Sequence, residues 1–117
     1  MKRGDVVILK FPYVEGGQGK NRPALVVQND LDNARLTHTI VAMISGNTRF
    51  SSEPAQLLVD PDTPAGKSSG LRGQSVVKCG NLFTALQEDI LRFIGHLPDD
   101  VMKQVDESLK AALSLDS

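Results

Sequence analysis

The sequence predicts a small, mainly β protein that ends in one α-helix. Short β-branched runs recur along most of the chain and are separated by segments rich in Gly, Pro, Asn and Asp. After Pro98, apolar residues recur at helical spacing, with charged residues between them. At 117 residues, the chain 1–117 is expected to be one domain with one core. Short strands in such a domain commonly curl into a barrel, which removes their open edges.

Six strands are expected in order along the chain. The run DVVILKF, at 5–11, is bounded by Gly4 and Pro12 and reads as a buried strand. Proline cannot donate to a central ladder, so Pro23 must lie near the start of the strand RPALVVQN, at 22–29. The other expected strands are THTIVAMI at 37–44, QLLVD at 56–60, QSVVKCG at 74–80 and RFIGHL at 92–97.

The helices are expected in two places. The segment 29–36 fits a single turn, with Asn29 or Asp30 as the N-cap. The segment DDVMKQVDESLKAAL places negative charge in its first turn, where it suits the helix dipole, and keeps one face apolar. The remaining segments are expected to be loops, namely 12–21, 45–55 and 61–73.

Charge and aromatic content limit the classes of partner. The net charge is −1 at pH 7, but Lys and Arg are in excess up to residue 78 and Asp and Glu are in excess after it. This distribution is compatible with a local nucleic-acid patch, and equally with ordinary charge fluctuation. With four Phe, one Tyr and no Trp, the chain lacks the aromatic platforms of many single-strand binders.

Cysteine usage and hydropathy indicate a cytoplasmic protein without a membrane partner. The single cysteine, Cys79, cannot form an internal disulfide, which favours a reducing compartment. In its apolar strand it is expected to be a small core residue rather than a nucleophile. The N-terminal apolar run is too short for a signal peptide, and no segment approaches the roughly 18 apolar residues of a membrane span.

No metal site and no cofactor are expected. His38 and His96 lie far apart, without Cys or paired carboxylates at metal-ligand spacing. Two short Gly-Lys motifs also fail as phosphate loops. Where that motif requires glycine, the chain has Pro61 for the first and Val14 for the second.

Five segments, in this order, resemble one family. They are KRGDVVILKF, RPALVVQND, IVAMISGNT, SGLRGQSVVKCGNLFTAL and IGHLPDDVMKQVDESLKAAL. Together they resemble the MazF/PemK/Kid toxins of bacterial type II toxin–antitoxin systems. The resemblance implies an SH3-like barrel of the CcdB/PemK plasmid-toxin type, with a C-terminal helix, short connecting helices and a homodimeric assembly. Most members are endoribonucleases that cut single-stranded RNA or mRNA at short sequences without metal, by attack of a ribose 2′-hydroxyl on its own phosphate. A cognate antitoxin blocks the site with a segment that folds on binding.

This chemistry assigns a role to Arg22, which stands where a glycine-rich loop enters a buried strand. The attack concentrates charge at phosphorus, and a guanidinium can meet two oxygens without losing its own charge. The alternative is a structural arginine paired with a carboxylate. Ser45 matches the hydroxyl that the family places beside the arginine, where it would hydrogen-bond the phosphate or the 2′-hydroxyl. A loop-capping serine is the alternative there.

The third catalytic position departs from the family. Some members carry Arg-Cys-Asp, with acid–base roles for the Arg and the Asp, where this chain has Lys78, Cys79 and Gly80. Lysine can donate a proton or offset charge, whereas glycine can do neither. Glu15, in the first loop, is a candidate base on position alone. A solvated strand residue is the alternative for Lys78.

Several loop residues are expected to border the site and to hold phosphates and splayed bases. They are Lys20, Asn21, Asn47, Arg49 and Arg72. The same groove is expected to receive acidic and apolar residues of the antitoxin.

Three other functions are alternatives to RNA cleavage. A CcdB-like gyrase poison acts through a C-terminal tryptophan, whereas this chain has no Trp and ends in AALSLDS. An SH3-like interaction domain displays an aromatic groove, which the composition disfavours. A catalytically weak relative that binds RNA or an antitoxin without cutting remains open because of Gly80.

Overall fold

The computed structural model describes residues 1–11 and 20–116. Its strands are β1 (Asp5–Phe11), β2 (Lys20–Val26), β3 (His38–Ser45), β4 (Gln56–Val59), β5 (Ser75–Leu86) and β6 (Ile90–His96). The helices are α1 (Asp30–Arg35), α2 (Pro64–Ser68), the 3-10 turn η1 (Gln87–Asp89) and α3 (Asp99–Leu113). Over the described ranges, no helix is long and apolar enough to cross a membrane.

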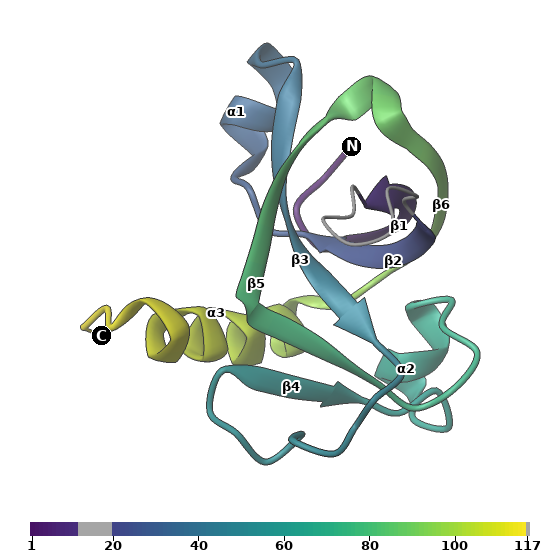
Figure 1. Cartoon of the computed structure of the whole chain (residues 1–117), viewed down its shortest axis with the longest axis vertical. Helices are drawn as coiled ribbons and strands as arrows, with labels where there is room; N and C mark the ends of the chain where they lie inside the picture. Colours follow the sequence, from purple (N-terminus) through teal and green to yellow (C-terminus); the bar gives the residue numbers. More distant parts are fainter. Residues whose placement is uncertain (12–19, 117) are drawn as a thin grey trace.

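The six strands form one antiparallel sheet in the order β4-β5-β3-β2-β1-β6, which curls strongly on itself (Figure 1). Its edge strands are β4 and β6, and α2 with the residues after it lies against β6. The Ser68 hydroxyl donates to the His96 carbonyl at 2.8 Å. A Cβ at Gly95 would lie only 2.3 Å from the Ser68 carbonyl oxygen, so glycine permits this approach. The predicted mainly β fold is confirmed, and a helix covers part of one edge.

A bulge divides β5 into two parts. Met43 of β3 faces Lys78, whereas the preceding residue, Ala42, faces Leu82. The three residues 79–81 are therefore extra on β5 and have no counterpart on β3. Bulges of this kind bend a strand and increase its twist, and β5 changes direction beside α3 in Figure 1. The part of β5 before the bulge, at the lower end in Figure 1, pairs with both β3 and β4. The upper part, after the bulge, pairs with β3 alone.

The two faces of the sheet bury separate apolar clusters. The first contains residues from five strands and packs against α3: Val6, Leu25, Ala42, Ile44, Val59, Val77, Cys79, Leu97, Met102 and Val105. The second lies on the opposite face of β1, β2 and β3: Val7, Leu9, Phe11, Ala24, Val26, Val41 and Ala85. Alternate residues of β1 belong to alternate clusters, as the period of two in a strand requires.

Most predicted elements are confirmed, with shifted boundaries. The first strand and the C-terminal helix have the predicted limits, and Asn29 caps α1 by accepting from the Asp32 amide at 2.8 Å. The second strand begins at Lys20 rather than Arg22, because Lys20 pairs with Phe11 of β1. It ends at Val26, three residues earlier than predicted.

The prediction of a loop over 61–73 was wrong in one part, because α2 lies within it. Its first turn is stabilised by the Thr63 hydroxyl, which accepts from the Gly66 amide at 3.0 Å. Pro64 occupies the start of the helix, where a missing backbone N–H is not costly. The fifth strand was also predicted too short, since β5 continues past the bulge to Leu86.

Candidate active site and an adjoining arginine pocket

The predicted catalytic residues meet where β2 and β3 stop pairing. Residues 20–23 of β2 pair with β1, but β2 pairs with β3 only where Ala24–Val26 lies against Val41–Met43. Side chains alternate along a strand, so Arg22, two residues before Ala24, and Ser45, two residues after Met43, leave the sheet on the same face as that pair. The sheet thus places on one face the arginine and the hydroxyl that the sequence analysis predicted to act together.

Lys78 shares the same face of the sheet. It pairs with Met43, which lies two residues before Ser45 on β3, so all three side chains leave on one side. Lys78 is half-buried and forms no ion pair with the described residues. The ladder therefore places a lysine diagonally across from Ser45, where its ammonium can offset charge or donate a proton.

The Ser45 hydroxyl is held by the turn that follows it. Its oxygen accepts from the Asn47 amide at 3.1 Å, and the Asn47 side-chain oxygen accepts from the Arg49 amide at 3.1 Å. This is the loop-capping role named as the alternative for Ser45. The two roles are compatible, because the hydroxyl accepts in the turn and retains its own proton for a ligand.

Arg22 is fixed by the strand to which it belongs. Its backbone pairs with Leu9 of β1, and Pro23 beside it restricts the backbone further. The side chain is half-buried. An arginine in this setting loses less conformational freedom on binding an anion than one on a loop.

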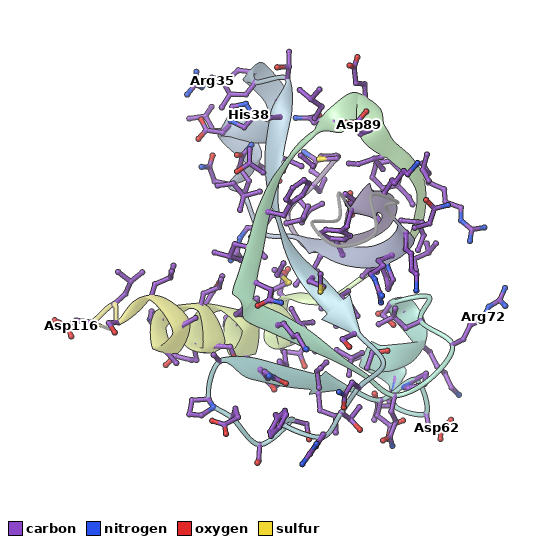
Figure 2. All side chains as sticks on the ribbon, in the orientation of Figure 1. Arg35, His38, Asp62, Arg72, Asp89 and Asp116 are labelled. Atoms are coloured by element: carbon purple, nitrogen blue, oxygen red, sulfur yellow. The ribbon has the colours of Figure 1, made fainter. Side chains whose placement is uncertain are left out.

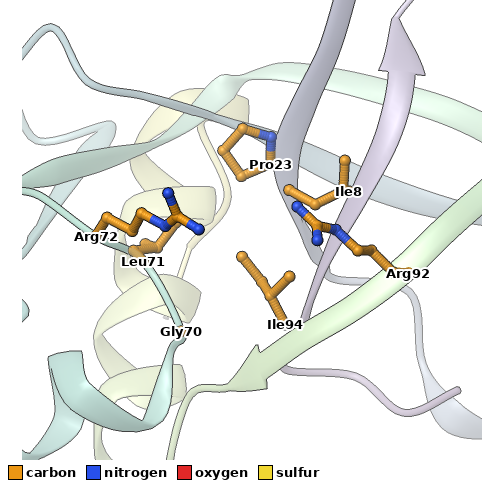
Figure 3. Close-up of a pocket in the computed structure, with 7 residues that line it drawn as sticks. All are labelled: Ile8, Pro23, Gly70, Leu71, Arg72, Arg92 and Ile94. Carbon is orange, nitrogen blue, oxygen red and sulfur yellow. The ribbon is translucent and has the colours of Figure 1, made fainter.

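A pocket of about 260 Å³ lies on the other face of the same strands, beside Pro23 (Figure 3). Its aliphatic surface comes from Ile8, Pro23, Leu71 and Ile94, with Gly70 at one side. Two exposed arginines, Arg72 and Arg92, stand on either side of the hollow in Figure 3. Neither guanidinium forms a hydrogen bond or ion pair with the residues that the structure describes.

The residues predicted to contact RNA fall in three places. Lys20 and Asn21 are exposed at the start of β2, and Asn47 and Arg49 lie in the turn after Ser45. The Arg49 guanidinium carbon stands 5.2 Å from the centre of the Phe50 ring, a cation–π contact. Arg72 lies in the pocket, and Figure 2 shows it projecting on the opposite side of the molecule from Arg35.

Sequence reasoning missed Arg92. It pairs with Ile8 of β1, which pairs in turn with Pro23 of β2. These three residues form one row across three strands, and Pro23 is the residue next to Arg22. The only signal in the sequence is a basic residue inside an apolar strand. Glu15, the candidate base, lies outside the described residues.

Cys79 is a core residue, as predicted. It has no exposed surface, and burial raises the pKa of its thiol to about 11, so the thiol stays neutral at physiological pH. Within residues 1–11 and 20–116, no three His, Cys, Asp or Glu side chains gather as metal ligands.

The fold and the site together define a small β-barrel protein that gathers cationic and hydroxyl side chains at one end, as an anionic ligand requires. Residues 2–113 match the family of PemK-like, MazF-like toxins of type II toxin–antitoxin systems. The chain belongs to this family.

Individual relatives agree with this assignment. The chain is 34% identical over 116 residues to the endoribonuclease EndoA of Bacillus subtilis (strain 168), covering 98% of this chain and 96% of the relative. It is similar to the solved structure of the Mycobacterium tuberculosis toxin MazF-mt6, with 27% identity, 95% and 99% of the two chains covered and a TM-score of 0.74. A mycobacterial endoribonuclease in complex with its cognate antitoxin shares the fold, at 20% identity, with 100% and 98% covered and a TM-score of 0.77.

Proposed function

We propose that this protein is a sequence-specific, metal-independent endoribonuclease toxin that cleaves single-stranded RNA or mRNA. The 2′-hydroxyl of the substrate attacks the adjacent phosphate, and a cognate antitoxin neutralises the toxin. Residues 1–117 act as one toxin domain in a cytoplasmic homodimer. Two findings support this function, namely membership of the toxin family and 34% identity to an endoribonuclease over nearly the whole chain.

One structural observation carries the assignment of the site. The strand register brings Arg22, Ser45 and Lys78 to one face of the sheet, although they lie on three different strands. Arg22 holds two oxygens of the phosphate and stabilises the charge that develops during attack. Ser45 donates its free proton to the phosphate or to the attacking hydroxyl, and Lys78 offsets charge or protonates the leaving oxygen. Lys20, Asn21, Asn47, Arg49 and Arg72 contact the rest of the RNA strand.

A weaker activity is the second candidate, and Gly80 favours it. Gly80 lies in the β5 bulge, beside buried Cys79, and supplies no carboxylate after Lys78. A protein built in this way binds RNA or antitoxin but lacks the base that removes the 2′-hydroxyl proton. The two candidates differ in rate rather than in where RNA binds.

The test is cleavage of a long single-stranded RNA by purified protein in excess chelator. We expect discrete fragments that end in a cyclic phosphate, and their ends give the recognition sequence. Replacing the 2′-hydroxyl at the cleaved nucleotide by hydrogen should abolish the cut at that position. If several RNAs remain intact while the folded protein still binds them, the second candidate replaces the first.

A further inference from the structure

The arginine pocket has the features of a ligand site. Arg72 and Arg92 stand across an aliphatic hollow without any ion-pair partner among the described residues. Like charges on two sides of a hollow repel each other, and low-dielectric walls focus their field into it. A bound anion removes this repulsion. The aliphatic surface of the pocket can also bury apolar parts of the molecule to which the anion belongs.

The fold fixes both arginines in place. Arg92 is held by the ladder that joins β6 to Ile8 of β1. Arg72 follows Gly70, whose positive φ of 75° turns the chain against β6; a Cβ there would lie 1.9 Å from the Ile94 carbonyl oxygen. Only glycine allows this close approach. Backbone packing therefore fixes the positions in the chain from which both arginines extend, and Figure 3 shows their guanidinium groups on either side of the hollow.

The pocket is continuous with the proposed catalytic site. Pro23 lines the pocket and is the residue next to Arg22 on β2. At this point β2 has no partner on the β3 side, so its open edge is bordered by the proposed catalytic residues on one face and by the pocket on the other. A strand of RNA held at Arg22 can thus continue around this edge to the hollow.

We propose that this pocket binds one nucleotide of the RNA, next to the nucleotide held at Arg22. Its base lies on the aliphatic surface of Ile8, Leu71 and Ile94, and its phosphate lies between the guanidinium groups of Arg72 and Arg92. This inference rests on the proposed function, and it adds Arg92 and a flanking subsite to it. Because no side-chain amide or carboxylate lines the pocket, the subsite selects weakly among bases.

RNA fits the pocket better than an acidic protein segment. Guanidinium groups bind phosphate bidentately and also stack on bases. An extended peptide would gain most of its affinity by pairing with an open strand edge. The edge of β6 at the pocket is occupied, since the Ser68 hydroxyl binds the His96 carbonyl and Gly70 packs against Ile94.

The test measures binding of fluorescein-labelled, single-stranded 2′-fluoro RNA of mixed sequence, which has no attacking hydroxyl. Its affinity for the full-length protein is measured over a range of salt concentrations for wild type, Arg72→Gln, Arg92→Gln and the double variant. Arg35→Gln is the matched control, because it removes one arginine that pairs with Asp32 in α1, far from the pocket. Thermal unfolding of each variant verifies the fold.

We expect Arg92→Gln to weaken RNA binding by roughly fivefold to tenfold, since an exposed phosphate contact is worth less than a buried one. The slope of log affinity against log salt should fall by about 0.7 for each pocket arginine removed. Arg35→Gln should leave both quantities close to wild type. A change in slope distinguishes a phosphate contact from a structural role, because a structural role would not alter the number of ions released.

Unchanged affinity and slope in the double variant would overturn the proposal. So would a double variant that keeps RNA affinity but loses binding to an acidic antitoxin, because the occupant would then be a protein segment. The proposed cleavage is tested separately, since the binding probe cannot be cut. Wild-type protein that binds the probe through Arg72 and Arg92 but cleaves no RNA would contradict the nuclease and leave the subsite intact.

Discussion

The two ends of the molecule use charged side chains in opposite ways. At the α3 end, the Arg3 guanidinium contacts Asp106 at 2.6 Å and the Val27 carbonyl at 2.8 Å. Lys110 pairs with Glu107 at 3.1 Å on the same helix. At the pocket end, Arg72 and Arg92 have no such partners. The cations around α3 are therefore paired within the described part of the chain, whereas the two arginines of the pocket are not.

This difference explains why net charge was a poor guide to function. The chain as a whole carries −1, which does not indicate a nucleic-acid partner. Pairing cancels much of the positive charge near α3, whereas Arg72 and Arg92 form no ion pair with the described residues. Cations that lack a partner lower the stability of the fold, but they are retained at sites where they bind a ligand.

After the loss of Arg22 itself, the largest effect on the chemical end of the molecule is expected from the loss of the Ser45 hydroxyl. Ser45→Ala should lower the rate of RNA cleavage by roughly 10-fold to 100-fold, because one positioned hydrogen-bond donor is lost. Ser45→Thr should recover most of the rate, since it restores a hydroxyl at the same place. Single-turnover cleavage measures both. Equal rates in wild type and Ser45→Ala would assign Ser45 to the turn alone.

At the opposite end, Arg3→Ala should lower the free energy of unfolding by about 1–2 kcal/mol, a value reduced by partial exposure of the pair. The arginine joins the N-terminus to α3 through Asp106 and to the end of β2 through Val27. Urea unfolding measures the change, and Lys103→Ala on α3 provides a control, because Lys103 forms no ion pair with the described residues. A loss no larger than that of the control would show that the contacts at Arg3 contribute little.

Gly80→Asp should raise the cleavage rate by roughly threefold to tenfold, if a carboxylate there supplies the missing base. The site accepts it, because a Cβ at Gly80 meets nothing within 4 Å. Gly80→Asn is the matched control, with the same shape and no charge. A rate that falls in both variants would indicate that the bulge needs glycine and that the base lies elsewhere.

The smallest effect concerns the buried thiol. In the unfolded chain Cys79 titrates near its ordinary pKa of 9.0, whereas burial raises the pKa in the folded protein to about 11. Between these values the folded state binds more protons, so the free energy of unfolding falls as pH rises from 9 to 11. Cys79→Ala lacks this component. The stability difference between wild type and Cys79→Ala should therefore shrink over that range, and a constant difference would contradict the account.

The sequence predicted the parts of the fold that depend on local pattern. The β-branched run of β1 and the apolar face of α3 have the same limits in the structure. Helix α2 was missed because it has only five residues and depends on the Thr63 cap. The upper part of β5 was missed because Gly80 and Asn81 resemble a strand end, whereas in the fold they form a bulge.

The same distinction applies to the site. Arg22 and Ser45 were predicted from the family resemblance together with their positions at strand ends, and the β2–β3 register places them on one face of the sheet. Arg92 was not predicted, because its place depends on pairing with Ile8, far away in the sequence. Two register shifts between β1 and β6 decide which residue of β6 faces that position. No local pattern encodes them.

The central claim is that the end containing Arg22 performs chemistry and the end containing Arg3 provides stability. The most direct test measures RNA cleavage in chelator and urea unfolding on the same preparations of wild type, Arg22→Ala and Arg3→Ala. We predict that Arg22→Ala lowers the cleavage rate by about 100-fold or more while remaining folded. Arg3→Ala should cleave at the wild-type rate under conditions in which it stays folded. If folded Arg22→Ala cleaves RNA at the wild-type rate, the account is contradicted.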